Sequence, residues 1–106
     1  MKVEGLIIAD KERWQSLYHG YADFYQMPMN EKIQETVWSW IFDENNKFYA
    51  IGVKSSEGRL IGFMHYSEML SPLRGALIGF LHDLYVHHDY RGTGAVQALF
   101  KELKII

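Results

Sequence analysis

The spacing of apolar residues changes along this chain, and each change marks the start of a new element. Residues 3–9 form a short apolar run that predicts a first strand. Asp10 is a suitable N-cap for the helix that follows, which should end near Met27 because Pro28 disfavours helical backbone in the residue before it. One face of this helix carries Trp14, Leu17, Tyr18, Tyr21 and Tyr25 at helical spacing.

A second helix is predicted to begin after Asn30, whose side chain can act as the N-cap. Its buried face is expected to consist of Ile33, Val37, Trp40 and Ile41. The helical pattern stops at residues 43–46, Asp-Glu-Asn-Asn, whose composition is typical of a turn. Runs rich in β-branched and aromatic residues then predict strands over 48–53, 60–69 and 77–86.

Short turns and a loop complete the second half of the chain. Residues 55–58 form a hairpin turn in which Gly58 can take a positive φ, and residues 71–75 form a loop. A polar loop over 87–94 leads into a last helix, with Val96, Leu99, Phe100 and Leu103 at helical spacing. The order is β-α-α-β-β-β-α, which predicts an α+β fold with a mainly antiparallel sheet and flanking helices, because three consecutive strands have short connections.

The last predicted strand, 77–86, has no later strand in the sequence to pair with its outer edge. An exposed apolar edge favours pairing with another chain. We therefore expect residues 1–106 to be a single domain that lacks its C-terminal strands and helix. We also expect a homo-oligomer, with a two-fold dimer as the simplest closed form.

The composition is that of an ordinary globular domain: 106 residues, 48% hydrophobic and 15% aromatic, with a formal net charge of −2. This balance disfavours a disordered chain and a broad surface for nucleic acid. No apolar run reaches about 18 residues, so a membrane partner is not expected. The absence of Cys excludes disulfides, thiolate catalysis and cysteine-ligated zinc. The N-terminus does not resemble a secretory signal, and a cytoplasmic protein is the expectation.

The segment over 84–99 is the most informative one, because a strand runs through a glycine-containing loop into a helix. Unpaired amides at a helix start bind phosphate or pyrophosphate, whereas the simpler alternative is a glycine turn before a helix. A Walker A loop is excluded because no Gly-Lys-Ser/Thr triplet follows Gly94. The dinucleotide fingerprint fails at Gln97, where a third small residue is needed.

The same segment resembles the acyl-coenzyme A site of GNAT (GCN5-related) N-acetyltransferases. Their signature is Arg or Gln, two residues, Gly, one residue, then Gly or Ala, and residues 91–95 fit its first five places. Val96 departs from it, since the family usually has Gly or Ala there. The strand over 80–86 is similar to the fourth strand of the polyamine-acetylating branch, and the element order matches the front part of the family's fold.

The resemblance implies acetyl-coenzyme A as co-substrate and a set of residues that bind it without a metal. Backbone groups at the strand end would hold the pantetheine arm, the loop amides would take the pyrophosphate, and Arg91 would fix the loop. The implied residues are Leu84, Tyr85, Val86, Arg91, Gly92, Thr93, Gly94, Ala95, Val96 and Gln97. A general acid on a further helix, present in relatives, is not found in these residues.

His82 is the candidate catalytic base, because an amine nucleophile must lose a proton and imidazole accepts one near neutral pH. The alternative for His82 is a hydrogen bond to a neighbouring strand. Asp83 should point to the opposite face by strict alternation, where it would bind a cationic substrate or serve as a structural partner. Tyr21 and Tyr25 would line the amine pocket, or simply belong to the core.

Three other histidines are not assigned a catalytic role. His65 lies inside a predicted strand and is interpreted as structural. His87 and His88 adjoin Asp89, but adjacent side chains diverge, so no metal site is expected. Two functions stay open: acetyl transfer to a primary amine of a small molecule or polyamine, and a non-catalytic remnant that binds coenzyme A or oligomerises.

Overall fold

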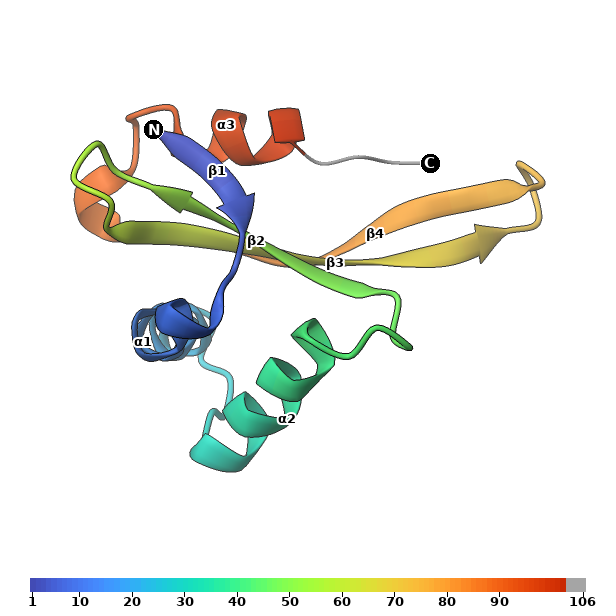
Figure 1. Ribbon diagram of the computed structural model, residues 1–106, viewed down its shortest axis with the longest axis horizontal. Helices are drawn as coiled ribbons and strands as arrows, with labels where there is room; N and C mark the ends of the chain where they lie inside the picture. Colours follow the sequence, from blue (N-terminus) through green and yellow to red (C-terminus); the bar gives the residue numbers. More distant parts are fainter. Residues whose placement is uncertain (103–106) are drawn as a thin grey trace.

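The structure, a computed structural model, describes residues 1–102 (Figure 1). The elements are β1 (Lys2–Gly5), the 3₁₀ turn η1 (Ile8–Asp10), α1 (Lys11–Phe24), α2 (Glu31–Ile41), β2 (Phe48–Lys54), β3 (Leu60–Ser71), β4 (Ala76–Val86), the 3₁₀ turn η2 (His88–Tyr90) and α3 (Ala95–Glu102). The predicted element order is confirmed. Leu103, which was expected on the last helix, lies outside the described residues.

The four strands form one sheet in the order β1-β2-β3-β4, and every neighbouring pair is antiparallel. Helices α1 and α2 cover one face of this sheet, and α3 covers the other (Figure 1). The α+β fold with a mainly antiparallel sheet is therefore confirmed. No helix within residues 1–102 combines the length and the apolar character that a membrane crossing requires.

The start of the chain differs from the prediction. The first strand ends at Gly5, and Asp10 does not cap α1 with its side chain. Instead, an Asp10 carboxylate oxygen accepts a hydrogen bond from the Ile7 amide at 2.9 Å, and the other lies 3.2 Å from Lys54 Nζ. Helix α1 ends at Phe24, three residues before the predicted end, because the chain turns at Gln26 with a φ of 55°.

The N-cap of α2 is confirmed, since the Asn30 side chain accepts a hydrogen bond from the Ile33 amide at 2.9 Å. The expected burial of Trp40 is wrong: it is 44% exposed, whereas Trp38 is 7% exposed. Positions two apart on a helix are about 200° apart around its axis, so only one of them can face the core. Trp38 takes that place because it packs on Trp14, with ring centroids 4.9 Å apart.

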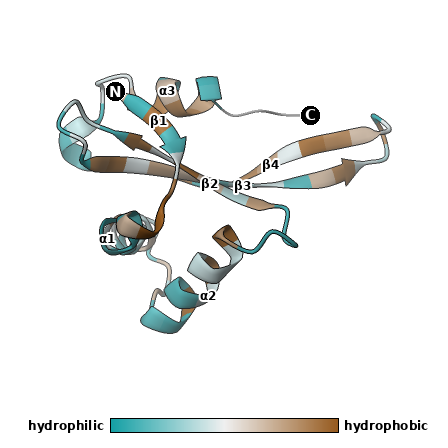
Figure 2. Ribbon diagram, viewed as in Figure 1, coloured by the Kyte–Doolittle hydropathy of each residue, from teal (hydrophilic) through white to brown (hydrophobic). Residues whose placement is uncertain are grey.

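Strands β3 and β4 continue beyond β2 as a two-stranded arm (Figure 1). Pairing of β2 with β3 ends at Ser67, so the rest of β3 pairs with β4 alone. Several apolar side chains on this arm are exposed, and Figure 2 shows hydrophobic segments along it. They are Met69, Leu70, Leu73 and Phe80.

Candidate active site

The loop between β4 and α3 has the backbone conformation that its glycines permit. Gly92 and Gly94 have φ values of 80° and 91°, which other residues rarely adopt. The first intrahelical bond of α3 runs from the Ala98 amide to the Gly94 carbonyl at 3.0 Å. The three preceding helical amides, at residues 95–97, therefore have no carbonyl partner within α3. Such amides favour an anionic ligand.

Two hollows adjoin each other at the end of β4. One measures about 300 Å³ and is lined by Phe24, Tyr25, Leu84, Tyr85, Val86, Arg91 and Val96. The other measures about 170 Å³ and is lined by Val86, Tyr90, Arg91, Gly92, Gly94, Ala95, Val96 and Gln97. Together they contain every cofactor residue implied from the sequence except Thr93, whose hydroxyl donates to the Tyr90 carbonyl. Phe24 and Tyr90 are additional lining residues, and sequence spacing gave no signal for them.

Arg91 connects the loop to the strand and to α1. Its Nε donates a hydrogen bond to the Val86 carbonyl at 3.0 Å. Its guanidinium lies 5.3 Å from the centre of the Phe24 ring and 5.4 Å from that of Tyr85. The Val96 side chain is exposed and lines both hollows rather than the core. A β-branched side chain thus borders both hollows at the position that departs from the signature given above.

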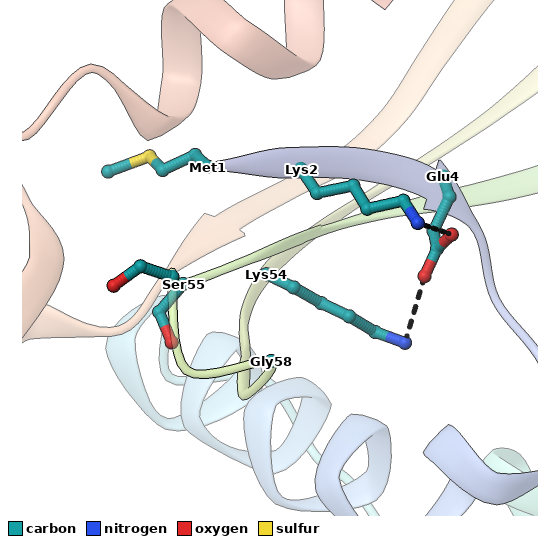
Figure 3. Close-up of a pocket in the computed structure, with 7 residues that line it drawn as sticks. Met1, Lys2, Glu4, Lys54, Ser55 and Gly58 are labelled. Atoms are coloured by element: carbon teal, nitrogen blue, oxygen red, sulfur yellow. Dashed lines mark ion pairs between the residues drawn. The ribbon is translucent and has the colours of Figure 1, made fainter.

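A larger hollow, about 490 Å³, lies where β1 meets the β2–β3 turn (Figure 3). Its charged groups pair with one another: Glu4 lies 3.5 Å from Lys2 Nζ and 3.1 Å from Lys54 Nζ. Lys54 also pairs with Asp10. These charges are mutually satisfied, and the hollow shares no lining residue with the two hollows at the end of β4, so its size alone gives it no chemistry.

A β-bulge at His82 determines how the next polar residues point. His65 pairs with Asp83 and Tyr66 pairs with Leu81, which leaves His82 as the extra residue of β4. His82 Nε2 lies 2.7 Å from the Ser67 hydroxyl, and an Asp83 oxygen lies 2.8 Å from His65 Nδ1. His65 and Ser67 are two apart on β3 and share a face. The prediction that His82 and Asp83 point to opposite faces is therefore wrong.

Asp83 belongs to a buried chain of hydrogen bonds. Trp14 Nε1 lies 3.0 Å from His65 Nε2, and His65 Nδ1 contacts Asp83. Burial lowers the pKa of His65. Burial acts to raise the pKa of Asp83, but the His65 hydrogen bond, helped by Tyr21, holds it below its ordinary value. The site therefore presents an ionised carboxylate beside a neutral imidazole.

Tyr21 and Tyr25 occupy neighbouring but different places. Burial and a contact with Asp83 raise the pKa of Tyr21 far above its ordinary value, so its hydroxyl stays protonated. Tyr25 is exposed and lines the 300 Å³ hollow. Their ring centroids are 5.0 Å apart, and the Tyr21 ring lies 6.4 Å from that of Tyr85. Tyr21 therefore spans the short distance between Asp83 and the hollow at the end of β4.

The expectation that His87, His88 and Asp89 diverge is wrong. The two rings stack with centroids 4.3 Å apart, and one ligand atom from each residue lies within 4.8 Å of the others. The tight turn η2 brings them together. His87 Nδ1 already accepts the Asp89 amide at 3.2 Å. The cluster is thus explained by hydrogen bonds within the turn.

Comparison with known proteins points to one family. The sequence model of the acetyltransferase (GNAT) family matches residues 14–105. The chain is 27% identical over 93 residues to the D-amino-acid N-acetyltransferase HPA3 of Saccharomyces cerevisiae. That match covers 87% of this chain but only 58% of the length of the yeast protein.

Solved structures with the same fold include two enzymes that act on different amines. The ribosomal-protein-alanine N-acetyltransferase from Brucella melitensis biovar Abortus 2308 is 25% identical with a TM-score of 0.72, and the match covers 95% of this chain and 67% of that one. The aminoglycoside 6'-N-acetyltransferase AAC(6')-IG from Acinetobacter haemolyticus is 17% identical with a TM-score of 0.77. That match covers 96% of this chain and 68% of the other. The latter likeness concerns the fold alone.

Proposed function

The chain belongs to the acetyltransferase (GNAT) family, and from this we propose that it transfers the acetyl group of acetyl-coenzyme A to a primary amine of a small molecule or polyamine. One observation carries the proposal. The two hollows at the end of β4 share Val86, Arg91 and Val96. The Tyr21 ring, which contacts the ionised Asp83, lies 6.4 Å from the ring of Tyr85 in the wall of the 300 Å³ hollow. A thioester bound along β4 would thus lie beside a group that attracts ammonium.

The residues at the end of β4 fit the chemistry of coenzyme A. The amides of residues 95–97 are free for the pyrophosphate, while the 300 Å³ hollow offers aromatic and aliphatic walls for the pantetheine arm. Gly92 and Gly94 leave open space where a Cβ would stand, so the backbone can approach the phosphates. When bound, acetyl-coenzyme A supplies an activated acetyl group.

Asp83 and His82 have different roles toward the amine: Asp83 binds it and His82 accepts its proton. Asp83 attracts the amine as an ammonium ion, and the Tyr21 side chain lies between this carboxylate and the hollow. His82 is exposed, and imidazole accepts a proton near neutral pH. The deprotonated nitrogen then forms a bond to the acetyl carbon while the carbon–sulfur bond breaks. His82 takes the first proton from the ammonium before this attack, the electron pair of the carbon–sulfur bond leaves with sulfur, and the second nitrogen proton passes to that sulfur to give the free thiol.

The test is acetyl transfer from acetyl-coenzyme A to a panel of D-amino acids, linear diamines and aminoglycosides, followed by thiol release and product mass. His82→Gln should lower the rate about 10²–10⁴-fold and remove the rising limb of the pH–rate profile. His19→Gln is the matched control, because His19 is an exposed residue of α1 paired with Asp23. An unchanged pH–rate profile in His82→Gln would exclude His82 as the base.

A second candidate, a non-catalytic module that binds coenzyme A or assembles, is favoured by the outer edge of β4. Within residues 1–102, β4 pairs with β3 alone, and apolar side chains of the arm are exposed. Pairing of two such edges would form a dimer. Light scattering coupled to size exclusion at micromolar concentration tests this. A dimer that binds coenzyme A but acetylates no amine would support the module, and a monomer would exclude assembly through this edge.

A further inference from the structure

We propose that His65 is a positioning residue for the acceptor amine: it holds Asp83 ionised and oriented, and Trp14 in turn fixes the proton of His65. The inference rests on the proposed function, in which Asp83 receives the amine. The three residues come from α1, β3 and β4, and the chain of hydrogen bonds runs from the core to the surface. This chain of hydrogen bonds cannot be inferred from neighbouring residues in the sequence, since Trp14 and His65 are 51 residues apart.

The protonation state of His65 follows from the partner on each ring nitrogen. An indole N–H can only donate, so His65 Nε2, 3.0 Å from Trp14 Nε1, must carry a lone pair. The single ring proton is then on Nδ1, which donates to Asp83 at 2.8 Å. The reverse tautomer would place two N–H groups against each other and a lone pair against a carboxylate. Trp14 thereby selects the tautomer that stabilises an ionised Asp83.

Packing prevents the imidazole from leaving this orientation. His65 is 0% exposed and is surrounded by the rings of Trp14, Tyr18, Phe48 and Phe63, with centroids 4.6–5.9 Å away. The Asp83 side chain is 18% exposed. The carboxylate therefore has one oxygen tied to a rigid partner and keeps an accessible side for a ligand.

The groups that face Asp83 carry no negative charge, so the carboxylate supplies the negative charge at this place. They are Tyr18 and Tyr21 from α1, His65 from β3 and His82 from β4. Burial raises the pKa of Tyr18 to about 12, and that of Tyr21 is also raised, so both phenols are neutral at pH 7. His65 is neutral by the tautomer argument. A cationic amine, rather than a neutral acceptor, matches this arrangement.

Two substitutions separate the two hydrogen bonds of His65. His65→Asn places an amide N–H where Nδ1 stands, so it keeps the donor to Asp83 and loses the acceptor for Trp14. His65→Gln places an amide oxygen where Nε2 stands, so it keeps the acceptor for Trp14 and loses the donor to Asp83. If His65 were purely structural, the two substitutions would change the properties of the site about equally. If His65 positions Asp83, His65→Asn should preserve the site and His65→Gln should not.

The first measurement needs no activity. Nitrogen-15 spectra of the whole chain should show His65 protonated on Nδ1, and carboxyl carbon-13 titration should show a higher pKa of Asp83 in His65→Gln than in the parent or His65→Asn. An Nε2-protonated His65, or an Asp83 pKa that is equal in the two variants, would overturn the proposal. This result stands whether or not the chain acetylates amines.

The second measurement uses 1,4-diaminobutane as the acceptor. Loss of a hydrogen bond to a charged group predicts a KM for the diamine about 10-fold higher in His65→Gln, with the KM for acetyl-coenzyme A unchanged. His65→Asn should stay within about threefold of the parent on the same scale. Equal diamine KM values in the two variants would overturn the positioning role. A parent chain without activity would instead contradict the proposed function, and the Asp83 titration would still decide the His65–Asp83 link.

Discussion

The two faces of the sheet bury different kinds of side chain. On the α3 face the core is aliphatic, with Val53, Ile61, Met64, Val86, Ala95 and Leu99. On the α1/α2 face, called the aromatic face below, the rings of Trp14, Tyr18, Trp38 and Phe63 lie among aliphatic side chains. His65 packs on three of these rings and is hydrogen-bonded at both ring nitrogens. An aliphatic core stabilises the fold by burying apolar surface, and it contains no group whose protonation it could determine. The aromatic face also determines the charge that Asp83 presents.

Burial explains why the polar groups of the aromatic face are so completely paired. An unpaired polar group in a core costs about 1–3 kcal/mol, so a buried histidine persists only with partners on both nitrogens. Within residues 1–102, no buried side-chain nitrogen or oxygen lacks a hydrogen-bond partner. A change on the aliphatic face should therefore alter stability alone, whereas one on the aromatic face should also alter the site.

The largest effect on stability is expected from Met64→Ala on the α3 face. Met64 is fully buried, and removing such a side chain typically costs about 2–5 kcal/mol. Urea unfolding measures this loss, and the pKa of Asp83 in the folded variant should stay at the parent value. A shifted Asp83 pKa would show that the two faces are not separable.

A smaller loss of stability, about 1–3 kcal/mol, is expected from Trp14→Phe, because His65 Nε2 loses its donor. Here the site should change as well, since only Asp83 then favours the Nδ1-protonated tautomer of His65 and the selection by Trp14 is lost. We expect a larger Nε2-protonated fraction of His65 in nitrogen-15 spectra than in the parent, with a higher Asp83 pKa. If the tautomer populations in Trp14→Phe equal those of the parent, Asp83 alone fixes the proton and the role of Trp14 is wrong.

A comparable loss of stability at neutral pH, about 1–3 kcal/mol, is expected from His65→Asn, because the buried Trp14 indole N–H loses its acceptor. What distinguishes His65→Asn is a change in the pH dependence of stability. Burial lowers the pKa of His65 in the folded chain, so between the ordinary value of 6.5 and the folded value the unfolded chain binds more protons. Stability is therefore full above about pH 6.5 and falls below it. His65→Asn removes this group, and its urea midpoint should fall less between pH 7 and pH 5.

Asp83 and His65 contribute to the pH dependence of folding stability in different pH ranges. Its folded pKa is lowered, so its stabilisation is present above the ordinary value of 3.8 and is lost only below it. A loss in His65→Asn as steep as in the parent between pH 7 and pH 5 would show that His65 is not the group that titrates.

Local signals in the sequence were sufficient for the order of elements, the Asn30 cap and the turn at Gly58, whose φ is 81°. Each depends on a few neighbouring residues. The burial of Trp38 instead of Trp40 depends on which side of α2 meets α1, and periodicity did not determine that. Packing between α1 and α2, rather than the local sequence, therefore determines that Trp38 is the buried residue.

The candidate site shows the same division. Glycine spacing was sufficient to locate the loop at Gly92 and Gly94, because positive φ is a local property. The bulge at His82 was not predictable, since it arises from the register between β3 and β4. That register also pairs His65 with Asp83, 18 residues apart, and turns both His82 and Asp83 toward one face.

The most direct test of the account is calorimetric titration of coenzyme A into the parent chain and Gly94→Asp, which places a carboxylate beside the free amides of α3. Gly94→Asn controls for the strain of a side chain at a φ of 91°. Gly75→Asp adds the same charge at the far β3–β4 turn, where φ is 57° and a Cβ meets open space. We predict that the parent, Gly94→Asn and Gly75→Asp bind coenzyme A and that Gly94→Asp binds at least about tenfold more weakly. Equal affinity of Gly94→Asp and Gly94→Asn would contradict a pyrophosphate site at this loop.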